Sequence, residues 1–172
     1  EPFRNVYTGI DKTSKRAVDE QVVADLKALD LSGMPWLELA RDFFLFSYCT
    51  RGMSFVDMAY LRYGNIANGI IRYNRKKTGQ QISVRIEPGV RDIMERYRKD
   101  AHADYVLPII QSDNEKDAFR QYQNRLRYYN KRLKELSELL GDGVSLTSYT
   151  SRHSWASTAH KHNVPIAVIS DG

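Results

Sequence analysis

One long stretch of the sequence, about residues 114–140, constrains the fold more than any other feature. Its apolar residues recur every three or four positions and are Phe119, Tyr122, Leu126, Tyr129, Leu133 and Leu136. That spacing predicts an α-helix of roughly seven turns with one apolar face, because a helix completes a turn every 3.6 residues. Gly141 and Gly143 end the pattern. The rest of the chain must therefore supply the surface that covers this face.

Shorter helices are predicted on both sides of the long one. They cover about residues 20–29, 36–50, 55–62, 88–98 and 148–161, and another begins at Pro165. Residues 36–50 are so rich in apolar side chains that this helix is expected to be largely surrounded by protein. Ser54 can cap the helix that follows, with Asp57 in the third position of a capping box, and Gly64 is expected to end it.

Two short apolar runs, residues 70–73 and 82–86, flank the polar turn Lys76-Lys77-Thr78-Gly79-Gln80. This arrangement predicts a β-hairpin. Residues 1–18 are polar and predicted to be extended, with a basic cluster at Lys12, Lys15 and Arg16. We therefore expect one domain over residues 1–172 that is mainly α with a small antiparallel β-sheet, an α+β fold.

Composition excludes several classes of protein. The single cysteine, Cys49, excludes an internal disulfide and a cysteine-based zinc site, and its apolar helical surroundings predict that it is buried. The four histidines are scattered, so we expect no metal site. No signal peptide and no membrane-spanning stretch is visible, which predicts a soluble, cytoplasmic protein without a membrane partner. The net charge of +5 is only weak support for an anionic partner.

The segment Tyr149-Thr150-Ser151-Arg152-His153 is the first candidate for chemistry. In a helix, Tyr149, Arg152 and His153 share one face. Arginine offers a forked, permanently charged donor that suits a phosphate, and the tyrosine hydroxyl or the imidazole can add a hydrogen bond. Alternatively, Arg152 pairs with a carboxylate and His153 packs in the core together with Trp155. The spacing alone favours this second interpretation.

Two other segments can present cations. The hairpin turn carries Lys76 and Lys77, which can reach into a groove or toward a leaving oxygen, although lysines in turns are usually just solvated. Arg51 precedes the helix that Ser54 caps, and a cation beside a helix N-terminus favours an anion. The alternative for Arg51 is an ordinary connection between helices with one exposed arginine.

The polar face of the long helix is strongly basic. Between residues 120 and 134 there are six basic residues and no acidic one: Arg120, Arg125, Arg127, Lys131, Arg132 and Lys134. Such a stripe can follow a phosphate backbone. Most charge runs, however, are solvated helix faces.

Taken in order, these segments resemble the catalytic domain of the tyrosine recombinase (phage integrase) family over essentially the whole chain. Residues 148–156 are similar to the family's H-x-x-R-H-[ST]-x-A box, and Lys77-Thr78-Gly79 is similar to the K-T-G turn of its hairpin. Residues 48–61 resemble its first arginine box, T-G-x-R-x-x-E-x-x-x-L. Residues 50–58 most resemble integrases of Bacteroides-type mobile elements.

The resemblance implies a site-specific recombinase or integrase that cuts and rejoins double-stranded DNA through a 3′-phosphotyrosyl intermediate, without a metal or nucleotide cofactor. It implies these catalytic residues: Arg51, Lys77, Tyr149 and Arg152. It implies these supporting residues: Ser54, Asp57, His153 and Arg41. The DNA-contacting residues that we expect are Lys76, Arg120, Arg127 and Lys131.

The sequence departs from the family pattern at two positions of the site. Tyr149 stands where the family usually has histidine, and it is a poorer general base near neutral pH. When Asp57 is aligned with the family's acidic residue, Ser54 occupies the position of the first catalytic arginine. Arg51, or Arg41 in the preceding helix, is then the candidate for the missing charge.

The family's last box and its nucleophilic tyrosine would follow Gly172, so the chain is expected to be a C-terminally truncated catalytic domain that also lacks the preceding DNA-binding domain. Family members act as homotetramers on paired DNA sites. For this fragment alone we expect a monomer that binds DNA, loses binding steeply with salt and does not cleave. Two alternatives remain: a non-catalytic DNA-binding module, which Ser54 and Tyr149 favour, and a helical protein-interaction domain.

Overall fold

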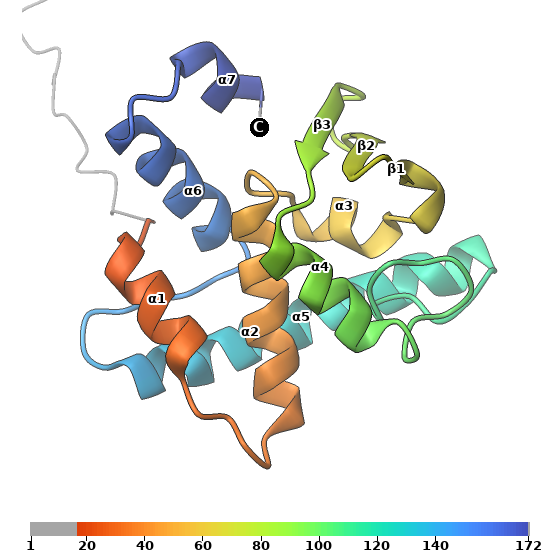
Figure 1. Ribbon diagram of the computed structural model, residues 1–172. Coiled ribbons are helices and arrows are strands. Elements are labelled where there is room, and N and C mark those ends of the chain that lie inside the picture. The colour runs from red at the N-terminus through yellow and green to blue at the C-terminus, as the bar shows by residue number, and fades with distance from the viewer. Residues whose placement is uncertain (1–16, 172) are drawn as a thin grey trace, which may run out of the picture.

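The computed structural model describes residues 17–171, so the basic cluster at Lys12, Lys15 and Arg16 lies outside the described residues. The described part contains seven α-helices, one 3-10 turn and one three-stranded sheet (Figure 1). In chain order the elements are α1 (Glu20–Ala28), α2 (Pro35–Cys49), α3 (Phe55–Tyr60), η1 (Tyr63–Asn65), β1 (Ile66–Ala67), β2 (Ile70–Asn74), β3 (Gln81–Arg85), α4 (Pro88–Tyr97), α5 (Glu115–Leu140), α6 (Thr150–Lys161) and α7 (Ile166–Asp171). The prediction of a mainly α chain with a small antiparallel sheet is confirmed.

Helix α2 is the centre of the core. It packs against α1, α4, α5 and α6, as Figure 1 shows. All side chains of residues 42–47 are buried, so this helix is surrounded by protein, as its composition predicts. The ring of Phe43 meets Tyr129 of α5 edge-on at 5.9 Å between centroids, and Tyr129 stacks on Phe55 of α3 at 5.0 Å. Aromatic contacts therefore join α2, α3 and α5.

The sheet has the strand order β1-β2-β3, and both strand pairs are antiparallel. In the predicted hairpin, Ile71 pairs with Val84 and Tyr73 pairs with Ile82. The side chains of Ile71, Ile82 and Val84 are buried, which fixes the register because a slip by one residue would expose them. Strand β1 was not predicted, since two residues are too short to show an alternating pattern.

Helix α3 begins as predicted but ends earlier. The Asp57 backbone N–H donates to Ser54 Oγ at 3.3 Å, so Ser54 is the N-cap. The prediction that Gly64 ends the helix was wrong, because α3 ends at Tyr60 and Gly64 lies inside η1. Beyond Tyr60 the backbone bonds to a distant loop instead: Tyr63 N–H donates to Asp104 O at 2.8 Å.

The apolar face of α5 is only half covered. In its C-terminal half, Tyr129, Leu133 and Leu136 are buried. In its N-terminal half, Phe119 is 52% exposed, and Tyr122 and Leu126 are only partly buried. The predicted helix is therefore confirmed, but its N-terminal half is less fully covered: Tyr122 and Leu126 pack at the edge of the core, and Phe119 is left largely exposed.

Two further observations concern individual helices. Cys49 is exposed, so the prediction that it is buried was wrong. It is the last residue of α2 and lies beyond the stretch, residues 42–47, that the other helices surround.

Within residues 17–171, none of the helices combines the length and the apolar character needed to cross a bilayer.

Candidate functional site

A cleft of about 420 Å³ lies where four separate segments meet. Its lining residues come from the start of α3, the hairpin turn, the middle of α5 and the start of α6. They are Ser54, Phe55, Val56, Asp57, Arg75, Lys77, Tyr122, Leu126, Ser148, Tyr149, Arg152 and His153. We call this the cationic cleft. It brings together most of the predicted catalytic and supporting residues, although they are nearly a hundred residues apart in the sequence.

The position of Arg152 depends on Gly52. Gly52 has φ +73°, and a β-carbon built on it would lie 2.7 Å from the Cα of Arg152. Real β-carbons do not approach backbone atoms that closely, so a side chain at this position would push α6 away. The turn between α2 and α3 thus packs directly against α6. Glycine is required in this turn for both its backbone conformation and its small size.

Buried hydrogen bonds hold the start of α6 against α2. Ser47 Oγ donates to the Met53 carbonyl at 2.7 Å and lies 2.7 Å from Ser151 Oγ. Because the Ser47 hydroxyl hydrogen is already used, Ser151 is the donor between the two serines. Both serines are buried, so their hydroxyl groups depend on each other for hydrogen bonds. Ser151 directly precedes Arg152, and these bonds therefore fix the backbone that presents the guanidinium.

Asp57 fixes the hairpin turn on α3. This buried carboxylate accepts the Lys76 backbone N–H at 2.8 Å and the Ser54 hydroxyl at 2.6 Å. The side chains of the two neighbouring lysines then point different ways. Lys77 lines the cationic cleft. The ammonium of Lys76 lies 4.3 Å from the ring centroid of Tyr60, outside this cleft.

The charges around the cationic cleft favour binding of an anion. Burial lowers the pKa of the Arg152 guanidinium from its ordinary value, and the positive charge of Arg75 lowers it further. Tyr73 and Asp57 act in the opposite direction on the pKa of Arg152. Arginine nevertheless stays protonated at any physiological pH. Two guanidinium groups and the Lys77 ammonium therefore share a partly desolvated space, where an anion would be stabilised.

Arg51 points away from the cationic cleft. It follows the end of α2 with φ +61°, at a position where glycine is usual, and the next N–H, that of Gly52, donates to Ser47 O at 2.8 Å. Its guanidinium donates to the Val168 carbonyl at 2.6 Å and to the Ser83 carbonyl at 3.4 Å. Arg51 therefore links the α2–α3 turn to α7 and β3, and it does not line the cleft.

Arg41 also lies outside the cleft. Its Nε donates to the buried carboxylate of Asp42 at 3.1 Å, and its Nη1 donates to the Leu29 carbonyl at 3.2 Å. The same carboxylate accepts Arg96 Nη1 at 2.5 Å and the Tyr97 hydroxyl at 2.7 Å. This cluster joins α2 to α4 at the edge of the core, with Asp42 buried and Arg96 exposed. The structure thus brings neither Arg51 nor Arg41 to the other predicted site residues.

Helix α6 starts slightly later than predicted. Tyr149 is its N-cap rather than a helical residue. Tyr149 is 69% exposed at the rim of the cleft. His153 is exposed as well, so the alternative in which it packs in the core was wrong. Arg152 is partly buried and packs against Gly52 of the α2–α3 turn.

Sequence reasoning missed Arg75 as a site residue. It belongs to the basic hairpin turn, in which only Lys76 and Lys77 were predicted to present cations. Arg75 and Lys77 line the cleft, while Lys76 points elsewhere. Residues 76–78 form a turn, so the alternation of a strand could not predict these directions.

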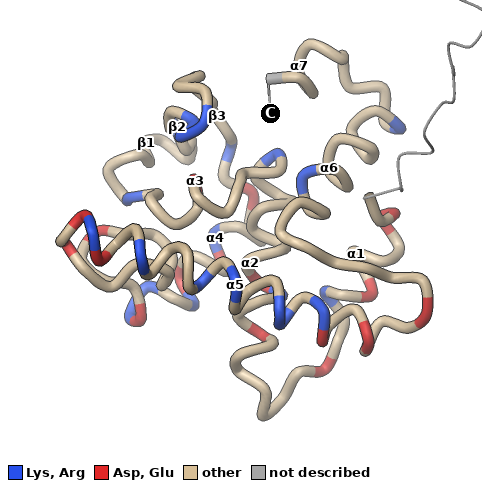
Figure 2. Tube along the Cα trace, turned by 180° about the vertical axis from the view of Figure 1, so that it is seen from behind, with Lys and Arg blue, Asp and Glu red and all other residues tan. Residues whose placement is uncertain are grey.

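Most of the basic stripe of α5 is solvent-exposed, but Arg132 is partly buried and donates to Glu135 and Tyr128. Figure 2 shows Lys and Arg repeated along this helix. Arg120, Arg127 and Lys131 are all exposed, and Arg120 donates to Asp117 at 2.7 Å one turn earlier. None of the three lines the cationic cleft. Within residues 17–171, no group of three or more His, Cys, Asp and Glu side chains is placed to hold a metal ion.

Known structures were compared with the chain. No protein-family model matches it, and no curated protein matches it. The structure is similar to XerA recombinase, with a TM-score of 0.60, 15% identity and coverage of 90% of this chain and 54% of that one. It is also similar to the catalytic core of lambda integrase, with a TM-score of 0.58, 15% identity and coverage of 86% and 85%.

A third similar structure is a lambda integrase (75–356) dimer bound to a COC′ core site. Its TM-score is 0.60 at 15% identity, with coverage of 90% of this chain and 56% of that chain. The chain thus spans about half the length of XerA and of this longer lambda integrase, and most of the isolated integrase core. The chain therefore has the fold of a tyrosine recombinase catalytic domain.

Proposed function

We propose that the cationic cleft binds a phosphodiester of double-stranded DNA, and that the chain is most of the catalytic domain of a tyrosine-type DNA recombinase or integrase. The observation that carries this proposal is the convergence of Arg75, Lys77 and Arg152 in one cleft of a recombinase-like fold. The three cations come from two separate segments, and the cleft is large enough for a phosphate group with its two ester oxygens.

The arrangement suits transfer of a phosphoryl group between oxygen atoms. When a tyrosine hydroxyl attacks the phosphorus, it gives up its proton to water, the new P–O bond forms as the bond to the 5′ oxygen breaks, and negative charge builds up on the other phosphate oxygens. Guanidinium groups fixed beforehand at those oxygens stabilise that charge. The Lys77 ammonium can supply the proton that the departing 5′ oxygen takes up. Rejoining runs the same steps in reverse.

We propose that Arg75 provides the second guanidinium of this site. Ser54 stands where the family pattern has its first arginine, but the Ser54 hydroxyl is engaged with Asp57 at 2.6 Å. Arg51 donates to Val168 and Ser83 instead of facing the cleft. Arg75 lines the cleft directly and lies near enough to Arg152 to lower its pKa.

Tyr149 then serves as a hydrogen-bond donor to the phosphate rather than as the nucleophile. It lies at the rim of the cleft, three residues before Arg152, at the position of a histidine in the family box. In that pattern the attacking tyrosine would come after Gly172. His153 and Asp57 would support the site, and Lys76, Arg120, Arg127 and Lys131 would contact DNA outside it. A homotetramer on paired DNA sites remains part of this proposal.

A second candidate function is DNA binding without catalysis. Two observations favour it: Ser54 replaces an arginine, and Tyr149 replaces a histidine that would be a better proton acceptor. Both candidates need the cations of the cleft for binding. They differ in whether a covalent protein–DNA intermediate forms.

Covalent trapping separates the two candidates. The natural protein that contains this chain would be incubated with a nicked duplex, so that the 5′-hydroxyl fragment diffuses away after cleavage and the adduct accumulates. We expect an adduct on a denaturing gel that Arg152→Ala and Arg75→Ala abolish. Arg91→Ala, at an exposed residue of α4 that does not line the cleft, should keep it. DNA binding without any adduct would contradict catalysis and favour the binding module.

A further inference from the structure

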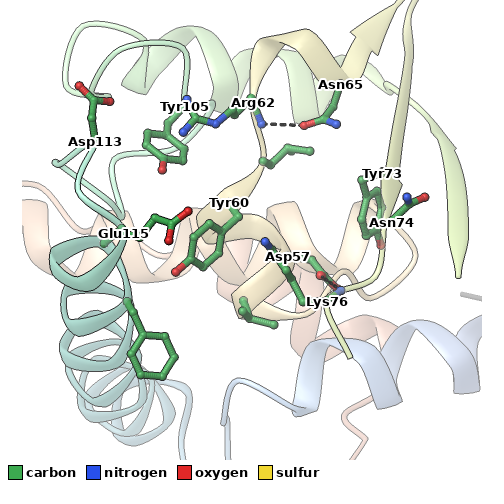
Figure 3. A pocket seen from close by; sticks show the side chains of 14 residues that line it. Asp57, Tyr60, Arg62, Asn65, Tyr73, Asn74, Lys76, Tyr105, Asp113 and Glu115 are labelled. Atoms are coloured by element: carbon green, nitrogen blue, oxygen red, sulfur yellow. Dashed lines mark hydrogen bonds between the residues drawn. The ribbon is translucent and has the colours of Figure 1, made fainter. Parts of the chain in front are cut away.

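A larger cavity of about 870 Å³ adjoins the cationic cleft and shares Val56 and Asp57 with it (Figure 3). We call it the aromatic pocket, because its walls include Tyr60, Tyr105 and Phe119. It lies between α3, the hairpin, the loop before α5 and the first turns of α5. Of its lining residues, the function proposed above uses only Asp57 and Lys76.

The two cavities lie next to each other along the same two elements, α5 and the hairpin. On α5, Tyr122 lines the cationic cleft, while Phe119, one turn earlier, lines the aromatic pocket. On the hairpin, Lys77 lines the cleft and Lys76 lines the pocket. A polymer whose phosphate occupies the cleft can therefore place its next unit in the pocket by following α5 and the hairpin.

Aromatic rings lead from one cavity to the other. The ring centroids of Phe119 and Tyr122 are 6.0 Å apart, and those of Tyr122 and Tyr60 are 6.3 Å apart. Phe119 is 52% exposed although it belongs to the apolar face of α5. An exposed ring beside a cationic groove is the arrangement on which unpaired nucleic-acid bases stack, because every base has an aromatic face.

The charges of the pocket distinguish a base from a phosphate. Asp113 and Glu115 lie on the side opposite Lys76 in Figure 3, with Tyr60 between them. These carboxylates would repel a phosphate, but they can accept hydrogen bonds from the amino group of a base such as cytosine. Arg62 also lines the pocket, but its guanidinium pairs with Asp104 and lies over the ring of Tyr105. The far wall thus carries two carboxylates beside a guanidinium that is already paired, which suits a base rather than its phosphate.

We propose that the aromatic pocket accepts an unpaired DNA base from a nucleotide next to the phosphate in the cationic cleft. The inference rests on the function proposed above. Removing a paired base from a duplex is costly, whereas a mismatched or displaced base has already lost its stacking. The chain should therefore prefer DNA with an unpaired base beside the bound phosphate. A basic peptide would also suit the two carboxylates, but the cations of the neighbouring cleft would repel it.

The test compares two short duplexes, one fully paired and one with a single unpaired cytosine, for binding to the 172-residue chain by fluorescence anisotropy. Loss of one stacked base corresponds to a change in affinity of roughly 5- to 100-fold. We expect wild-type protein to bind the second duplex tighter by about that factor. Phe119→Ala should remove the preference and leave the affinity for the paired duplex unchanged, whereas Phe119→Trp should keep the preference.

The matched control is Leu139→Ala, because Leu139 lies on the same helix, is 53% exposed and does not line the pocket. It should keep the preference. Equal binding of the two duplexes by the wild type, or a preference that survives Phe119→Ala, would overturn the inference while leaving the proposed function intact. Failure to bind either duplex would refute the proposed function itself. A lysine-rich peptide that binds the wild type but not Phe119→Ala, without any base preference, would make the pocket a peptide site and overturn the inference.

Discussion

Replacing Gly52 by alanine tests how the fold positions Arg152. The change has two separate costs. Alanine must adopt the left-handed φ of +73°, and its new methyl group must occupy space 2.7 Å from the Cα of Arg152. Gly33 is the matched control, since it has φ +78° and its β-carbon would meet nothing within 4 Å. Gly33→Ala therefore carries the first cost without the second.

The two costs can be given magnitudes. A left-handed alanine costs about 1–2 kcal/mol. Forcing a methyl group into packed atoms costs a further 1–3 kcal/mol or so, about 2–5 kcal/mol in all for Gly52→Ala. For a chain of this length 1 kcal/mol shifts Tm by about 2–4 °C, so we expect a fall of roughly 4–20 °C for Gly52→Ala and roughly 2–8 °C for Gly33→Ala.

Thermal unfolding followed by circular dichroism, with both variants measured side by side, gives the difference directly. DNA binding well below both Tm values gives the second result: Gly52→Ala should weaken it because α6 and Arg152 are displaced, and Gly33→Ala should not. Equal Tm shifts for the two variants, with unchanged DNA binding, would refute the close approach of α6 to the turn.

Three further predictions concern buried polar groups. The Tyr129 hydroxyl is buried and has no hydrogen-bond partner among the described residues, so Tyr129→Phe should stabilise the fold by about 1 kcal/mol in urea unfolding, and a clear loss would contradict this. Burial raises the pKa of Tyr73 to about 12, so the folded state keeps a proton that the unfolded chain releases. Stability should therefore fall between about pH 10 and 12, less steeply in Tyr73→Phe, and identical pH profiles would count against it. Asp42 is 2% exposed, so Asp42→Ala, which leaves the Arg41 guanidinium, with 11% of its side chain exposed, without this carboxylate, should cost about 3–5 kcal/mol. Arg96→Ala, at a half-exposed partner of Asp42, should cost less in the same unfolding assay, and the reverse order would contradict the structure.

Local patterns predicted most of the fold. The periodicity of residues 114–140 predicted α5, the two apolar runs predicted the hairpin, and Ser54 predicted the start of α3 because each signal depends on neighbouring residues alone. The end of α3 and the exposure of Cys49 were missed. The first depends on a hydrogen bond between Tyr63 and Asp104, far apart in the sequence, and the second depends on which side of α2 its neighbours leave open.

The residue types of the candidate site were predictable from the sequence, but the directions in which their side chains point were not. Motif order placed Lys77 and Arg152 in one site, and the structure brings both into one cleft. Which arginine accompanies them depends on contacts that sequence spacing does not contain. Arg51 donates to the carbonyl of Val168 and so points away from the cleft. Arg75 lines the cleft because Asp57 holds the backbone of the hairpin turn.

The central claim is that the cationic cleft binds a DNA phosphate, and the salt dependence of DNA binding tests it most directly. The affinity of the chain for a short duplex would be measured over a range of salt concentrations. Each phosphate contact contributes about 0.9 to the slope of log affinity against log salt. We predict that Arg152→Ala, Lys77→Ala and Arg75→Ala each weaken binding and lower the slope, by no more than about that amount because the three cations share one phosphate, while Arg91→Ala changes neither. Wild-type affinity and slope in all three cleft variants would contradict the account.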